Sequence, residues 1–118
     1  MTEYVVLLPG DESVWEQTSP ADKERMYAIH REFAQALEER GHKVTGGSEL
    51  AHSRDTKVLR TDAEGRHTVT EGPYAETVEQ LTGFYVVESG DLDDLIDVCK
   101  ILGRAEGAIE IRAAVAGS

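Results

Sequence analysis

His30 has the most informative position among the side chains able to move a proton near neutral pH. It shares helical steps of three and four residues with Met26, Phe33 and Leu37, so its imidazole is expected to point toward a sheet rather than toward solvent. Enclosed in that way it needs a hydrogen-bond partner, and it is suited to act as a general acid or base. The alternative is a neutral core histidine that donates to a backbone carbonyl.

Further polar side chains gather around the Gly72-Pro73 turn. Loops held by a rigid scaffold often carry binding groups, and a carboxylate here can accept a proton or hold a cationic atom of a ligand. Equally, these side chains can satisfy free N–H groups at a strand end, or the stretch can clasp a partner subunit. The ligand-binding residues predicted from the turn and the strand after it are Glu71, Tyr74, Glu76, Thr77, Glu79 and Tyr85.

The remaining candidates point to structure more than to chemistry. Cys99 lies on the apolar stripe of the second expected helix and is predicted to be a small buried hydrophobe. His42, His52 and His67 are dispersed and lack ligand spacing, so we expect no metal site and cofactor-free chemistry. Trp15 either lines a pocket or covers the core.

These side chains need a scaffold, which hydrophobic periodicity predicts. A helix is expected over residues 20–40, begun by Ser19-Pro20 and ended by Gly41. Asp91 is expected to cap a second helix whose apolar stripe reaches Leu102, and a turn or loop is expected after Pro9-Gly10. The expected strands are 4–8, 44–50, 83–88 and 108–115, with a hairpin of 57–60 and 67–70.

This order of elements predicts an α+β fold, a ferredoxin-like split βαβ plan with an inserted β-hairpin. Two helices cover one face of an antiparallel sheet, yet the strands near Tyr4 and Phe84 are apolar on both faces. The pattern contains no third long helix for the second face. We therefore predict a homodimer, in which the same face of another copy covers it and two sheets form a dimeric α+β barrel.

Composition limits the classes of partner. The 118 residues hold 12 Lys and Arg against 23 Asp and Glu, a formal net charge of −11, with 40% hydrophobic residues. This balance predicts a single domain over residues 1–118, and the acidic charge disfavours nucleic acid and anionic membrane surfaces. The sequence has a lone cysteine, no pattern typical of a secretion signal and no apolar run of about 20 residues. We therefore expect a cytoplasmic protein.

One stretch of the chain resembles a known family. Residues 70–85 read TEGPYAETVEQLTGFY and are similar to the DGPF-type proteins of the YCII-related family, whose pattern is roughly D-G-P-F-A-E-T-K-E-Q-L-G-G-F/Y-Y. The likeness covers nearly the whole domain and includes Gly10-Asp11-Glu12, Trp15, Ser19-Pro20, residues 46–50 and Glu110-Ile111-Arg112. Glu71, Tyr74, Val78 and Thr82 stand where the family usually has Asp, Phe, Lys and Gly.

The resemblance implies a dimeric α+β barrel and no generally established reaction. Shorter relatives are proposed to use a His on the first helix and an Asp near the end of the second helix. His30 stands at the matching helical position in this sequence. Residues 101–104, where the Asp would lie, contain none. One expected function is binding of a small organic molecule, with proton transfer by His30 and by Glu76 or Glu79. The alternative, suggested by relatives encoded beside alternative sigma factors, is a non-enzymatic protein-interaction or regulatory module.

Overall fold

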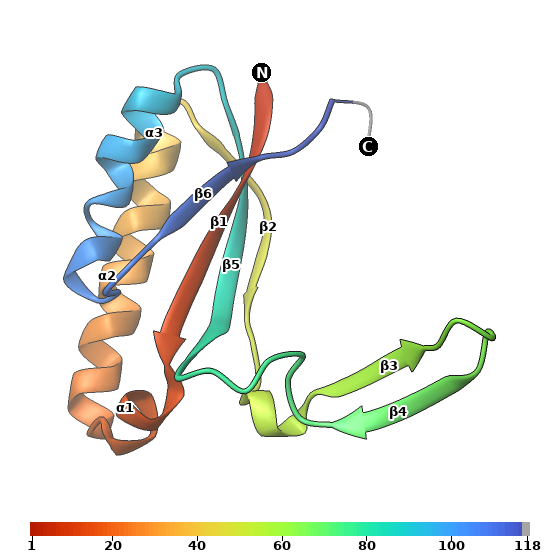
Figure 1. The fold of residues 1–118 in the computed structure, drawn as a ribbon. Helices are drawn as coiled ribbons and strands as arrows, with labels where there is room; N and C mark the ends of the chain where they lie inside the picture. The colour runs from red at the N-terminus through yellow and green to blue at the C-terminus, as the bar shows by residue number, and fades with distance from the viewer. Residues whose placement is uncertain (117–118) are drawn as a thin grey trace.

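Two helices cover one face of a four-stranded antiparallel sheet, and a separate hairpin projects beyond the opposite face (Figure 1). The computed structural model describes residues 1–116. The helices are α1 (Glu12–Gln17), α2 (Pro20–Glu39) and α3 (Leu92–Cys99), with 3-10 turns η1 (Ser53–Asp55) and η2 (Leu102–Arg104). The strands are β1 (Thr2–Asp11), β2 (Lys43–Glu49), β3 (Lys57–Thr61), β4 (His67–Glu71), β5 (Glu79–Ser89) and β6 (Glu110–Ala113).

The strand order in the main sheet is β2-β5-β1-β6, and each neighbouring pair is antiparallel. β3 and β4 pair only with each other in the described chain. The α+β class and the inserted hairpin predicted from periodicity are therefore confirmed.

The two long helices begin where their capping residues predict. The hydroxyl of Ser19 accepts a hydrogen bond from the Asp22 amide at 3.1 Å, and Pro20 occupies the first turn of α2. The carboxylate of Asp91 accepts from the Asp94 amide at 3.0 Å to begin α3. Among the described helices none is both long and apolar enough to cross a membrane.

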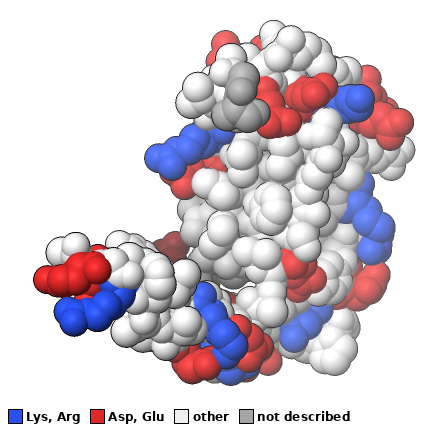
Figure 2. Space-filling view, turned by 90° about the vertical axis from the view of Figure 1, so that its right-hand side faces the viewer, with Lys and Arg blue, Asp and Glu red and all other residues white. Residues whose placement is uncertain are grey.

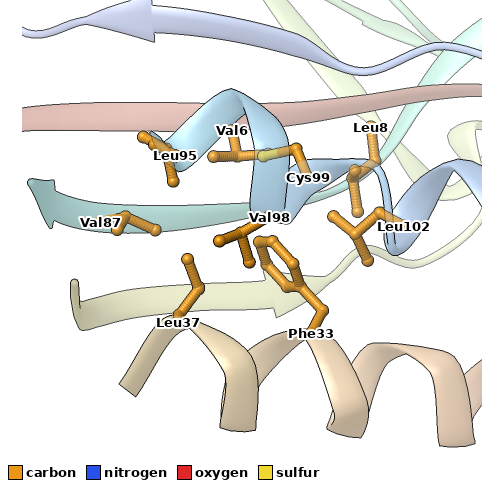
Figure 3. Close-up of a cluster of buried hydrophobic side chains, with 9 residues drawn as sticks. All are labelled: Val6, Leu8, Phe33, Leu37, Val87, Leu95, Val98, Cys99 and Leu102. Carbon is orange, nitrogen blue, oxygen red and sulfur yellow. The ribbon is translucent and has the colours of Figure 1, made fainter. Parts of the chain in front are cut away.

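The core lies between these helices and the sheet (Figure 3). Apolar side chains from every layer are buried there: Val6, Leu8, Phe33, Leu37, Val87, Leu95, Val98, Cys99 and Leu102. The buried cysteine predicted from the helical stripe is confirmed, and burial raises the pKa of the Cys99 thiol to about 11. A thiol with that pKa stays protonated near neutral pH and is a packing group rather than a nucleophile.

Three local predictions were wrong. The turn or loop expected after Pro9-Gly10 is instead helix α1, which Asp11 caps by accepting from the Ser13 amide at 3.0 Å. The first strand does not end before Pro9, because a register shift at Leu8/Pro9 allows pairing with β5 to continue to Asp11. The second helix ends at Cys99, and the apolar stripe continues to Leu102 through the tighter turn η2.

The sheet face opposite the helices is apolar at its centre. Because side chains alternate along a strand, Val5 and Leu7 point away from the buried Val6. Their direct partners on β5 are Val86 and Phe84. These four side chains are half-buried and form the apolar open face, the name used below for this surface.

Candidate functional site

A cavity of about 800 Å³ lies beside α1 and α2, against the ends of β1 and β2, the middle of β5 and the turn after η2. This volume is in the range of sites that hold small organic molecules. Its lining is mainly apolar, with polar groups at two places: one around His30, the other around Trp15 and Glu49. Tyr85 and Glu106 line the cavity beside His30.

His30 is held between a tyrosine and a carboxylate. Its Nδ1 lies 2.6 Å from the Tyr85 hydroxyl, and its Nε2 lies 3.0 Å from Glu106 Oε1. The side chains of His30 and Glu106 are 21% and 19% exposed, so this group is enclosed yet reachable from the cavity. Three elements meet here, since His30 comes from α2, Tyr85 from β5 and Glu106 from the turn after η2.

The network fixes where the protons lie. An ionised Glu106 carboxylate only accepts, so Nε2 of a neutral His30 carries the proton and donates it. Nδ1 then accepts the hydrogen bond that the Tyr85 hydroxyl donates. Burial, followed by the negative charge of Glu106, raises the pKa of Tyr85 above 10.0. The arrangement is therefore a protonated tyrosine beside an oriented imidazole.

The second polar part of the cavity combines two aromatic rings with a carboxylate. Trp15 and Tyr27 meet edge to face, with ring centroids 5.6 Å apart. The Tyr27 hydroxyl donates to both oxygens of Glu49 at 3.0 Å, and the ammonium of Lys23 lies 4.8 Å from the centre of the Trp15 ring. Of the two alternatives for Trp15, the structure thus supports pocket lining.

The cavity wall at α1 is tied to η1 by ionic hydrogen bonds. The Ser53 amide donates to Glu12 at 2.7 Å. His52 and Arg54 both donate to Glu16, at 2.8 and 2.7 Å, and the hydrogen bond from Arg54 lowers the pKa of that carboxyl. These bonds hold the start of the hairpin against the helix that forms the wall.

The structure brings together only part of the predicted site. Tyr85 lies against His30, as a ligand-facing role for both residues requires. The other predicted ligand-binding residues do not line this cavity: Glu71, Tyr74, Glu76, Thr77 and Glu79. Their side chains are exposed, and the ligand-binding role assigned to them stays a prediction.

Side-chain to backbone hydrogen bonds are present in this stretch, but their side chains donate to carbonyls and do not accept from the free N–H groups that the alternative expected. The Thr77 hydroxyl donates to the Glu79 carbonyl at 2.6 Å, and the Gln80 amide donates to the carbonyls of Ala75 and Thr77. Glu71 instead forms an ion pair with Lys57 across the hairpin at 2.6 Å.

Glu106 was missed by sequence reasoning. The resemblance implies an Asp near the end of the second helix, and residues 101–104 contain none. The chain turns through η2 after α3, and Glu106 follows directly, with its amide bonded to the Leu102 carbonyl at 2.8 Å. Glu106 lies two residues after position 104 and is the nearest carboxylate beyond the helix. That nearness is the signal by which it could have been found.

A second histidine network lies outside the cavity. His42 is buried, and its ring nitrogens lie 2.8 Å from Ser89 Oγ and 2.7 Å from Asp94 Oδ2. The hydrogen bond from His42 and the contact with Arg40 lower the pKa of Asp94. Ser89 is only 1% exposed, so no substrate reaches its hydroxyl. We interpret this group as a polar joint between β2, β5 and α3.

Comparison with known proteins agrees with the motif in residues 70–85. A family model described as the YCII-related domain matches residues 2–115. An uncharacterised protein of Rhizobium meliloti (strain 1021) is 34% identical over 116 residues, which covers 92% of this chain and 89% of that protein. The match extends over both the His30 site and the projecting hairpin. The chain therefore belongs to the YCII-related domain family.

Proposed function

We propose that this protein binds a small organic molecule in the cavity beside His30 and catalyses cofactor-free proton transfer on it. The observation that carries the proposal is the chain of hydrogen bonds from Tyr85 through His30 to Glu106, which opens into a space of about 800 Å³. The buried His42 also has partners at both ring nitrogens. What distinguishes the His30 group is that it lines a cavity a ligand can enter.

The proton path follows from the orientation of the groups. A proton leaving the ligand passes to the Tyr85 hydroxyl oxygen while the proton of Tyr85 moves to Nδ1 of His30. The resulting imidazolium still donates from Nε2 to Glu106, whose negative charge stabilises it. The reverse transfers return a proton to another atom of the ligand, so the residues end as they began.

Charge selects the class of ligand. The cavity is lined by Asp11, Glu12, Glu16, Glu49 and Glu106. Its two cationic side chains are engaged: Lys23 lies over Trp15, and Arg54 pairs with Glu16. A carboxylate or phosphate ligand would meet unfavourable charge, so the proposed ligands are uncharged or cationic.

A thermal-shift screen with uncharged, cationic and anionic metabolites tests the binding site. A ligand at about 100 times its Kd adds about 2.7 kcal/mol of stability. We expect such a shift in the wild type and its loss in His30→Ala. His67→Ala is the matched control because His67 lies on the exposed hairpin. A ligand that stabilises the wild type and His30→Ala equally would place the binding site elsewhere.

Catalysis has its own test. In D₂O, nuclear magnetic resonance follows exchange of the carbon-bound hydrogens of a ligand found in the screen. General acid or base groups contribute about 10²–10⁴-fold to rate, so Tyr85→Phe should slow the exchange by that order. Exchange at the same rate in Tyr85→Phe would leave binding without the proposed chemistry.

The finer architecture that we propose is a ferredoxin-like protomer in a dimeric α+β barrel. Figure 2 looks onto the side of the molecule opposite the helices, where uncharged surface fills the centre and charged side chains lie around it. The apolar open face, with Val5 and Val86 at its centre, supports this proposal because an exposed apolar sheet face is stabilised by an equal face.

A further inference from the structure

The hairpin β3–β4 is an arm that, in the described chain, is supported only at its base and by Tyr74. In the described residues, the hydrogen bonds and ion pairs of residues 57–71 stay within the hairpin or reach Tyr74. A two-stranded hairpin alone is marginally stable in water. An arm of this length is therefore expected to pack against something outside its own subunit.

One face of the arm is bare. Leu59 and Val69 are direct cross-strand partners, so they share a face, and each is 63% exposed. The opposite face is partly covered: Val58 is half-buried, and the Arg60 guanidinium lies 5.4 Å from the centre of the Tyr74 ring. The unpartnered apolar surface is thus the Leu59–Val69 face.

The direction of the arm is fixed at its base. Ser53 donates through its amide and its hydroxyl to Glu12 of α1, at 2.7 and 2.5 Å. The Gly72 amide donates to the Thr56 carbonyl at 2.7 Å and closes the two strands. Held in this way, the arm projects past the sheet on the side away from the helices, the side of the apolar open face (Figure 1).

Charge limits where a second copy can contact this one. Two copies that each carry −11 repel one another, so they can meet only through surfaces of low net charge. Residues 57–71 contain three basic and three acidic side chains, so the formal net charge of the arm is zero. The arm and the apolar open face are thus the surfaces through which a second copy can approach.

We propose that the arm of each subunit packs its Leu59–Val69 face against a second copy seated on the apolar open face. This inference rests on the proposed two-copy assembly and assigns it a second, separate contact. By two-fold symmetry each arm holds the other subunit, so the interface extends beyond the paired sheets. The ion pairs Lys57–Glu71 and Arg66–Asp62 satisfy the charges of the arm within itself.

Sedimentation velocity over a concentration series tests the contact with substitutions on the two faces of one strand. Val69→Glu and Val69→Lys should each raise the dimer dissociation constant at least about tenfold, because either charge is placed on a buried apolar contact. Thr68→Glu and Thr68→Lys place the same charges on the opposite face of β4. They should change the dimer dissociation constant less than about threefold. Circular dichroism should show all four variants folded, since neither residue belongs to the core.

The outcomes separate this contact from the assembly on which it depends. A dimeric wild type with unchanged dissociation constants in both Val69 variants overturns the arm contact and leaves the pairing of the sheets. Equal weakening by the Thr68 and Val69 variants overturns the assignment of the bare face. A wild type that stays a single subunit at every concentration overturns both the assembly and the arm.

Discussion

At the scale of single residues, the site depends on one histidine whose two nitrogens have different partners. Glu106 orients the ring and fixes the proton on Nε2, while Tyr85 presents its hydroxyl to Nδ1. Because Tyr85 keeps its proton at neutral pH, the imidazole and not a free tyrosinate is the base of the proposed reaction. In the proposed reaction Glu106 positions His30 and stabilises its positive charge, so its effect is measurable without a substrate.

The ionisation of Tyr85 provides that measurement. Its pKa lies above 10.0 first because of burial and second because of the negative charge of Glu106. Glu106→Gln removes the second cause only, so the pKa of Tyr85 should fall part of the way toward 10.0. The pKa of Tyr85 is measured by nuclear magnetic resonance of ¹³C-labelled tyrosine rings between pH 8 and 12.

The matched control is a second tyrosine in the same titration. Burial and Glu49 raise the pKa of Tyr27, so this pKa should not respond to Glu106→Gln. A Tyr85 titration unchanged in that variant would mean that Glu106 exerts no electrostatic influence at the site.

At the scale of elements, the cavity depends on how closely β2 approaches β5. The register between these two strands shifts between Val44 and Gly46, as it does at a β-bulge. Gly47 has φ of +144°, and a Cβ added there would lie 2.6 Å from the Phe84 carbonyl oxygen. Glycine at this position lets the end of β2, with Glu49, reach the cavity.

Substitution of this glycine is predicted to be costly. Gly47→Ala combines a strained backbone with a backbone clash and should lower the free energy of unfolding by about 2 kcal/mol or more. Gly103→Ala is the control, because a Cβ there meets nothing within 4 Å, and its effect should stay within about 1 kcal/mol. Urea unfolding followed by circular dichroism measures both. Equal stability of the two variants would contradict the close approach of the strands.

At the scale of the whole molecule, assembly has to overcome a formal net charge of −11 per copy. The apolar open face provides uncharged contact area at its centre, flanked by Glu110 and Arg112 of β6. The helical side carries many charged residues, such as Glu24, Arg31 and Glu38. The proposed dimer follows from this unequal distribution of charge and apolar surface.

A single lysine on the open face should prevent that assembly. Val86→Lys places an unpaired charge at the centre of the proposed interface, so the dimer dissociation constant should rise by about 100-fold or more. Ala28→Lys, on the exposed surface of α2, adds the same charge outside the interface and should leave it unchanged. Equilibrium sedimentation compares the two. A Val86→Lys protein as dimeric as the wild type would contradict pairing through this face.

The sequence by itself determined the types and order of the main elements. Periodicity and capping depend on residues three or four positions apart, so α2, the start of α3 and the hairpin were predictable within a few residues. The same local signals indicated that His30 faces the sheet and that Cys99 is buried. Helix α1 was missed because six residues with only two apolar side chains give a weak periodic signal.

Only the tertiary structure decided which side chains meet. His30 and Glu106 are 76 positions apart, and their contact depends on how α3 packs on the sheet and how η2 turns back toward α2. The polar residues after Pro73 were expected beside His30 but lie outside its cavity, because the hairpin carries their segment away from the helices. No local pattern encodes such distances, since they are set by the packing of whole elements against one another.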